Sequence, residues 1–201
     1  ALGFLNGPRE PRITIPGGAH AAADRVLADA GWNGAAPLVA LAPGAAYGGA
    51  KRWPPERFGE IAASLAADGI DCVVVGSAAD GETSADVARA FEHHGGRAAG
   101  LHDLTGRTDL LALAGILARC RALITNDSGA MHLAAAAGVP VTAVFGPTNE
   151  HATRPIGEAH AIVSHPVWCR PCMLRECPID HRCMRGIAVS AVAGAARRTM
   201  R

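Results

Sequence analysis

The sequence predicts an α/β domain built on a doubly wound parallel sheet, with a Cys-rich C-terminal loop. Short apolar runs alternate along the chain with segments in which apolar residues recur at helical spacing. The loops after several runs are rich in glycine and polar residues, as is usual where parallel strands end. Alternation of strands and helices is typical of a parallel sheet covered by helices on both faces.

The N-terminal part predicts a linker, a helix and a first buried strand. Residues 1–20 are rich in proline and glycine and predict a linker, with a short edge strand at 12–15. Residues 21–30 have helical spacing. Residues 38–42 form an apolar run short enough for a buried strand. The folded domain would then occupy residues 21–201.

Helices and strands alternate along the rest of the domain. Pro54 and Pro55 suit the first turn of a helix that ends at Gly69, because an N–H in that turn needs no intrahelical partner. Thr108 is expected to cap a later helix. Four further parallel strands are predicted near residues 71–75, 97–101, 121–125 and 140–145. Helices are predicted near 81–93, from 108 to 117, at 128–137 and at 189–200, whereas residues 149–185 are predicted to be irregular.

Composition and charge exclude some classes of function. Most of the apolar residues of the 201-residue chain are small, and the chain has one tyrosine, which suits helices packed tightly on a sheet. A net charge of +1 gives no electrostatic reason to expect a nucleic-acid partner. No run approaches the ~18 apolar residues of a membrane span. Because the chain begins with Ala1 rather than Met, we expect it to be part of a longer protein.

Residues 122–148 are the most informative segment. An apolar strand ends in the turn NDSG, a helix of small residues follows, and the next strand ends in Gly-Pro-Thr. The N–H groups of Ser128 and Gly129 at the helix start favour an anion such as phosphate, with Asp127 and His132 beside it. Asp127 or Ser128 would serve only as an N-cap in the alternative interpretation. The specialised loop after the next strand favours the ligand site.

Three blocks of the sequence resemble one protein family, in the family's order. They are residues 43–54 (PGAAYGGAKRWP), residues 76–80 (GSAAD) and residues 125–148, which contain TNDSG, MH and FGPT. The blocks resemble the ADP-heptose:lipopolysaccharide heptosyltransferases of glycosyltransferase family 9, and residues 43–54 resemble the heptosyltransferase II branch. The resemblance covers about residues 37–201. It implies the Rossmann-like, donor-binding C-terminal half of a two-domain GT-B fold.

The resemblance gives the strand-end loops roles in binding a sugar nucleotide. Lys51 and Asp127 are the candidate catalytic residues, and Lys51 would stabilise the departing diphosphate, because a cation neutralises the charge that develops there. Asp80 would accept hydrogen bonds from ribose hydroxyls, or would only begin a helix. Thr105 and Gly106 would border the adenine. The donor crevice is predicted to involve Gly44, Lys51, Gly76, Ser77, Asp80, Thr105, Gly106, Asp127, Ser128, Gly129, His132, Gly146, Pro147 and Thr148.

Four cysteines lie within fifteen residues near the C-terminus. Cys169, Cys172, Cys177 and Cys183 have the spacing C-x2-C-x4-C-x5-C within residues 165–185, which we call the Cys-rich loop. Four thiolates would hold one structural zinc or iron ion and order a loop that has few large apolar side chains. Two disulfides or four free thiols are the alternatives. The segment resembles one found in only some heptosyltransferases, so we expect it to be unnecessary for glycosyl transfer and to lie away from the donor crevice.

The sequence therefore predicts the donor-binding domain of an inverting glycosyltransferase. The resemblance implies heptose transfer from ADP-heptose, or from another sugar nucleotide, to the lipopolysaccharide inner core without a catalytic cofactor. The catalytic base and the contacts to the lipid A–core acceptor would belong to an N-terminal domain outside these residues, so the 201 residues alone should transfer little heptose. A cytoplasmic location is implied, with a peripheral contact to the inner membrane left open.

Two other functions are compatible with the residues. One is a non-catalytic nucleotide-binding or interaction module built round the cysteines, and the other is a GT-B-like sugar-nucleotide epimerase. A dinucleotide dehydrogenase is disfavoured, because no Gly-x-Gly-x-x-Gly follows any predicted strand.

Overall fold

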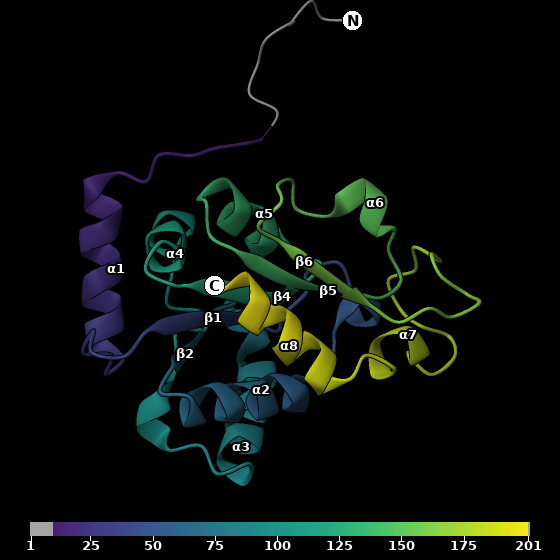
Figure 1. Cartoon of the computed structure of the whole chain (residues 1–201), viewed down its shortest axis with the longest axis horizontal. Helices are drawn as coiled ribbons and strands as arrows, with labels where there is room; N and C mark the ends of the chain where they lie inside the picture. Colours follow the sequence, from purple (N-terminus) through teal and green to yellow (C-terminus); the bar gives the residue numbers. More distant parts are fainter. Residues whose placement is uncertain (1–9, 201) are drawn as a thin grey trace, which may run out of the picture.

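A computed structural model describes residues 10–200, in which six strands form one parallel sheet (Figure 1). The strands are β1 (Leu38–Ala42), β2 (Asp71–Val74), β3 (Leu101–Asp103), β4 (Ala122–Asn126), β5 (Val141–Phe145) and β6 (Ala161–Ser164). Their order is β3-β2-β1-β4-β5-β6, and each neighbouring pair is parallel, as predicted. The order reverses between β1 and β4, which is where sheets of this kind bind ligands.

The central strands are buried along their whole length. Every residue of β1, β4 and β5 is buried, which explains why these strands are continuous apolar runs rather than alternating ones. Leu41 of β1 pairs with Ile124 of β4, and Ala42 pairs with Thr125. The two strands therefore end side by side, and the loops that follow them meet at the same edge of the sheet.

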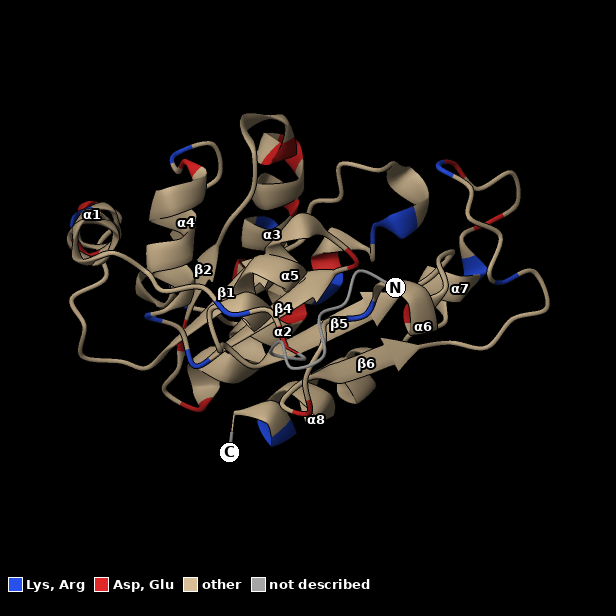
Figure 2. Ribbon diagram, turned by 90° about the horizontal axis from the view of Figure 1, so that it is seen from above, with Lys and Arg blue, Asp and Glu red and all other residues tan. Residues whose placement is uncertain are grey.

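Helices cover both faces of this sheet (Figure 1). One face carries α2 (Pro55–Ala67), α3 (Gly81–His93), α7 (Arg182–Arg185) and α8 (Val189–Thr199), whose core includes Phe58, Phe91, Met184 and Val192. The other carries α1 (Gly17–Asp29), α4 (Leu110–Leu117) and α5 (Gly129–Ala136), whose core includes Leu27, Ile116, Leu117 and Met131. A short helix, α6 (Glu150–Thr153), follows β5. Charged residues of both signs are scattered over these elements (Figure 2).

The N-terminal elements differ from the prediction. Helix α1 begins at Gly17, before the predicted end of the linker, and residues 1–9 of that linker lie outside the described residues. Residues 12–15 are not in a strand; the Ile13 N–H donates to the carbonyl of Ala136 at 2.9 Å. The prolines at 11 and 16 flank this stretch and offer no N–H to a sheet, which explains why no ladder forms.

Strand β3 also begins later than predicted. Residues Ala98–Gly100 form a 3₁₀ helix, η3, and only Leu101–Asp103 pair with β2. Small residues surround this turn, and Gly95 just before it has φ +84°, so the run has little of the side-chain bulk that favours a strand. Helix α4 is capped by Asp109 rather than Thr108, because the Asp109 carboxylate accepts the Ala112 N–H at 2.7 Å.

The segment 149–185 is more regular than predicted, because it contains α6, β6 and α7. The sequence of β6, AIVS, is short and only partly buried, and such an edge strand gives a weak pattern. None of the helices in residues 10–200 is long and apolar enough to cross a membrane.

Candidate functional site

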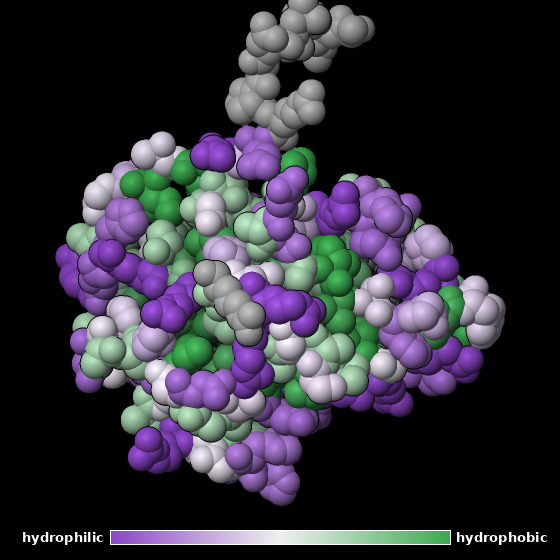
Figure 3. Space-filling model, in the orientation of Figure 1, coloured by the Kyte–Doolittle hydropathy of each residue, from purple (hydrophilic) through white to green (hydrophobic). Residues whose placement is uncertain are grey.

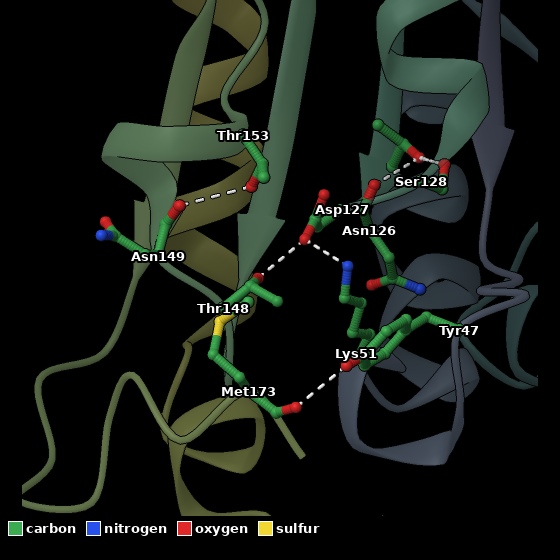
Figure 4. Close-up of polar contacts among 10 residues, drawn as sticks. Tyr47, Lys51, Asn126, Asp127, Ser128, Thr148, Asn149, Thr153 and Met173 are labelled. Atoms are coloured by element: carbon green, nitrogen blue, oxygen red, sulfur yellow. Dashed lines mark hydrogen bonds and ion pairs between the residues drawn. The ribbon is translucent and has the colours of Figure 1, made fainter. Parts of the chain in front are cut away.

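The loops after β1 and β4 bring Lys51 and Asp127 together (Figure 4). Lys51 ends the 3₁₀ helix η1 (Gly49–Lys51), and its Nζ lies 2.6 Å from Oδ2 of Asp127, which directly follows β4. Thr148, in the loop after β5, donates its hydroxyl to the same carboxylate oxygen at 2.7 Å. The side chains of Lys51 and Asp127 are only 12% and 7% exposed. We call Lys51, Asp127 and Thr148 the Asp127 cluster. Its hydrogen bonds offset the free-energy cost of burying these polar side chains away from water.

A buried amide holds the Lys51 loop in place. The side-chain oxygen of Asn126 accepts the Trp53 N–H at 3.1 Å, and its nitrogen donates to the Pro43 carbonyl at 2.6 Å. One side chain on β4 thus fixes both ends of the loop that carries Lys51. The sequence interpretation gave Asn126 no role, although a buried amide at a strand end always needs such partners.

A cavity of about 330 Å³ lies next to the Asp127 cluster, at the start of α5. This volume falls in the range of small-molecule sites. Its walls are the loops after β1, β2 and β4 and the first turn of α4. Of the predicted donor residues, the cavity is lined by Gly44, Gly76, Ser77, Asp80, Ser128 and Gly129. It is also lined by Thr108, Asp109, Leu110 and Leu113, which the prediction did not include because the helix α4 showed only a core pattern.

Asp80 lines this cavity and also begins a helix. Its Oδ2 accepts the N–H of Ser77 at 2.9 Å and the Ser77 hydroxyl at 2.7 Å. A Cβ atom at Gly44 would lie 2.5 Å from the Asp80 carboxylate, so glycine is needed where the two loops meet. The capping alternative for Asp80 is therefore present, and its carboxylate is held in a fixed orientation at the cavity wall.

Ser128 is the N-cap residue of α5, but its side chain makes no capping bond. Its hydroxyl lies 3.0 Å from that of Thr125 instead. The Asp127 carboxylate is likewise occupied by Lys51 and Thr148 rather than by the helix start. The capping interpretation of these residues therefore does not account for their side-chain contacts.

Eight of the predicted donor residues do not line the cavity: Lys51, Asp127 and Thr148, which form the adjacent Asp127 cluster, Gly146 and Pro147, which precede Thr148, and Thr105, Gly106 and His132. The Gly106 N–H donates to the Gly76 carbonyl at 2.9 Å, so Gly106 supports the loop after β2, whereas the Thr105 N–H donates to the Asp103 carboxylate at 2.9 Å. His132 is exposed on α5 and lines a separate cavity with His151 and Arg154. Met131 and Ala134 occupy the sheet side of α5, which leaves His132 on its outer side.

The Cys-rich loop reaches the candidate site, contrary to the expectation that it lies away from it. The Gly146 carbonyl accepts from Arg170 at 2.9 Å, and the Pro147 carbonyl accepts the Met173 N–H at 2.9 Å. Because Thr148 follows directly, these contacts shape the loop that supplies one member of the Asp127 cluster. The spacing of the cysteines could not indicate this contact, because the Arg170 side chain and the Met173 N–H make it rather than the thiols.

The four clustered cysteines surround one small cavity of about 20 Å³ as free thiols. The Cys177 sulfur accepts the His181 N–H at 3.3 Å, and the pKa of Cys177 is lowered, chiefly by the Ile179 N–H. Burial raises the pKa of Cys183. Within residues 10–200, however, no group of three or more Cys, His, Asp or Glu side chains is arranged closely enough to hold a metal ion. The structure thus gathers the thiols without confirming the predicted metal ion.

Comparison with known proteins establishes the family. The model of glycosyltransferase family 9 (heptosyltransferase) matches residues 2–182. The chain belongs to this family. It is 36% identical over 127 residues to lipopolysaccharide heptosyltransferase 2 of Salmonella typhimurium, and the alignment covers 63% of this chain but 36% of that protein. The chain therefore spans much less than the full length of this family 9 relative.

Solved structures agree with the family 9 fold. E. coli ADP-heptose lps heptosyltransferase II superimposes with a TM-score of 0.79 at 27% identity, covering 98% of this chain and 55% of that one. The iron-containing glycosyltransferase TibC from enterotoxigenic E. coli H10407 gives a TM-score of 0.62 at 18% identity, covering 96% and 48%. At that identity the TibC likeness shows the fold alone. The predicted family and the doubly wound fold are both confirmed.

Proposed function

We propose that this chain is the donor-binding part of an inverting glycosyltransferase that transfers heptose from ADP-heptose to the lipopolysaccharide inner core. The observation that carries the proposal is the Asp127 cluster beside a cavity at the switch point of the sheet. Membership of the heptosyltransferase family supports it. The structural relative from E. coli is itself named for ADP-heptose.

In this proposal the cavity holds the nucleotide. Asp80, oriented by Ser77, accepts hydrogen bonds from the ribose hydroxyls. Leu110 and Leu113 offer an apolar wall to the base. The backbone N–H groups at Ser128 and Gly129 lie at the positive end of the α5 dipole, where a diphosphate is favoured.

Lys51 then stabilises the leaving group. When the bond from the sugar to the diphosphate breaks, negative charge grows on the departing ADP, and a fixed cation lowers the barrier. The ammonium group has three N–H donors, and Asp127 accepts one of them, so others remain for phosphate oxygens. Asp127 thereby holds the Lys51 ammonium group in a fixed position. The base that activates the acceptor hydroxyl, and the contacts to the lipid A–core acceptor, are assigned to an N-terminal domain at the cytoplasmic face of the inner membrane.

Nucleotide selectivity tests this proposal. The chain should bind ADP and ADP-heptose at least about 10-fold more tightly than UDP or GDP, because the apolar wall of Leu110 and Leu113 suits adenine better than the smaller uracil or the more polar guanine; a 10-fold preference corresponds to roughly 1.4 kcal/mol. Calorimetric titration with the four ligands measures the ratio. Equal affinity for all of them would favour a general nucleotide-binding module, and a preference for UDP would favour an epimerase-like function.

Transfer activity is a separate prediction. The 201 residues should bind the donor but transfer little heptose to a lipid A–Kdo acceptor, because they correspond to 55% of E. coli heptosyltransferase II and include no assigned base. Release of ADP in the presence of acceptor measures the rate. Robust transfer by this chain alone would place the base within these residues and overturn the assignment.

We also propose that Cys169, Cys172, Cys177 and Cys183 hold one structural zinc or iron ion. The convergence of all four thiols on one cavity supports this, as does the N–H donated to the Cys177 sulfur, which favours a thiolate. The ion would order the loop and take no part in the transfer.

Metal content and its dependence on one thiol test the metal proposal. Protein purified without added metal should carry about one equivalent of zinc or iron, and Cys177→Ser should carry far less, since structural sites need all four ligands. Elemental analysis measures the content. Cys120→Ala is the matched control, because Cys120 is buried in the core on the opposite face of the sheet from Cys183, so the variant should keep the metal. Less than about a tenth of an equivalent in the unsubstituted protein would retire the proposal.

A further inference from the structure

The Cys-rich loop joins the two loops that present the Asp127 cluster. Met173 lies at the junction. Its N–H donates to the Pro147 carbonyl at 2.9 Å. Its own carbonyl accepts the Tyr47 hydroxyl at 2.9 Å (Figure 4). One residue therefore connects the loop before Thr148 with the loop before Lys51. Met173 has φ +57°, which is costly for a residue with a side chain, so its partners must hold it in that conformation.

Backbone contacts extend this junction. The Ala50 N–H donates to the Arg175 carbonyl at 2.9 Å, and the Gly49 N–H donates to the Glu176 carboxylate at 3.0 Å. A Cβ atom at Gly48 would lie 2.3 Å from the Arg175 carbonyl oxygen, and Gly48 has φ +154°. Glycine at this position thus permits the η1 turn to lie directly against residues 173–176.

Tyr47 connects this junction to Lys51. The Lys51 Nζ lies 4.6 Å from the centre of the Tyr47 ring, and the Arg175 guanidinium lies 5.1 Å from it. The ammonium group therefore sits between an aromatic ring and the Asp127 carboxylate. A lysine side chain has four rotatable carbon–carbon bonds. The ring and the carboxylate already restrict their rotation, so Lys51 loses less conformational entropy when it binds an anion.

The other side of the loop faces solvent. Trp168 is 77% exposed, and Met173, Leu174 and Ile179 are also exposed. Figure 3 shows apolar residues among polar ones at the right edge, over this part of the molecule. The loop therefore buries few large side chains, and its inward contacts are mostly the polar ones that reach the Lys51 and Thr148 loops.

We propose that residues 173–176 of the Cys-rich loop position Lys51 for the donor's diphosphate through Tyr47, which makes Tyr47 a positioning residue of the donor site. The inference rests on the proposed function, in which Lys51 meets the diphosphate. It gives the Cys-rich loop a role in donor binding, beyond the ordering of its own segment. Arg170 anchors the same loop on the other side, through the Gly146 carbonyl and Glu150.

Calorimetric titration of the 201-residue chain with ADP tests the inference. Tyr47→Ala should weaken ADP binding about 5-fold, because it removes both the ring beside Lys51 and the bond to Met173. Tyr47→Phe keeps the ring and should weaken binding about 2-fold. Trp168→Ala, an equally drastic change at an exposed aromatic residue of the Cys-rich loop, should leave the affinity unchanged. Circular dichroism of each variant checks that it is folded.

A double variant and a spectroscopic probe separate positioning from other effects. In a Lys51→Ala background, Tyr47→Ala should cause no further loss of affinity, since Tyr47 acts through Lys51. Lys51 is the only lysine of the chain, so lysine labelled with ¹³C gives one side-chain set of NMR signals. Those signals should carry a ring-current shift that is lost in Tyr47→Ala and altered in Tyr47→Phe.

Three results would contradict either the positioning inference or the proposed function, and each result identifies which of the two has failed. If Lys51→Ala weakens ADP binding but Tyr47→Ala and Tyr47→Phe do not, the positioning inference is wrong and the proposed function stands. If Tyr47→Ala costs as much in the Lys51→Ala background as alone, Tyr47 acts independently of Lys51 and the inference is also wrong. If Lys51→Ala itself leaves ADP binding unchanged, the failure lies in the proposed function.

Discussion

Replacement of Lys51 by alanine is expected to weaken the binding of ADP-heptose by about 10- to 100-fold. A charge-assisted contact to a phosphate is worth ~1.5–3 kcal/mol. The Lys51 side chain is only 12% exposed, so in the variant water cannot easily take its place beside the phosphate. Asp127→Ala should have a similar effect, because it leaves the Lys51 ammonium without its partner at 2.6 Å and the Thr148 hydroxyl without its acceptor. Calorimetric titration of the folded variants measures both losses.

Arg198→Ala is the matched control for the loss of one positive charge. Arg198 is exposed in the last turn of α8, far from the loops that follow β1 and β4, so its removal should leave donor affinity within about 2-fold. If Lys51→Ala and Asp127→Ala both bind ADP-heptose as well as the unsubstituted chain, the Asp127 cluster is not part of the donor site.

The parallel sheet could be predicted because its strands are buried on both faces. Residues 38–42 and 141–145 are uninterrupted apolar or neutral runs, and each is followed by a loop rich in glycine and proline. The position of each strand, its parallel direction and the edge at which its loop lies therefore followed from local patterns. Strand β6 gave no comparable pattern, because it is an edge strand of four partly buried residues. Strand β3 was placed too early, because its preceding turn is made of alanine and glycine.

Only the residues of the candidate site that directly follow the ends of strands could be predicted from the sequence. Lys51, Asp127 and Thr148 follow three neighbouring strands, and the fold brings them together. The side of α5 on which His132 lies depends on how that helix packs, and a motif does not encode that. The contact between residues 47–50 and 173–176 was equally invisible, because each of its hydrogen bonds uses at least one backbone group and joins residues more than 120 positions apart in the sequence.

Asn126 is the residue whose loss should cost most in stability at this site. Asn126→Ala is expected to lower the free energy of unfolding by about 2–5 kcal/mol, because it leaves the Trp53 N–H and the Pro43 carbonyl buried without their partners. For a chain of this length, that corresponds to a drop in Tm of roughly 5–15 °C. Chemical denaturation and thermal unfolding measure the two quantities.

Asn149→Ala is the matched control, since it removes the same side chain from an exposed cap of α6, where Asn149 accepts the His151 N–H at 3.0 Å. Its cost should be about 0.5–1 kcal/mol. If the two variants lose the same small amount, the Asn126 contacts do not hold the loop. If the expected difference is found, ADP affinity of the folded Asn126→Ala protein should also fall, because the segment between Pro43 and Trp53 carries Lys51 and is then free to move its ammonium group away from Asp127.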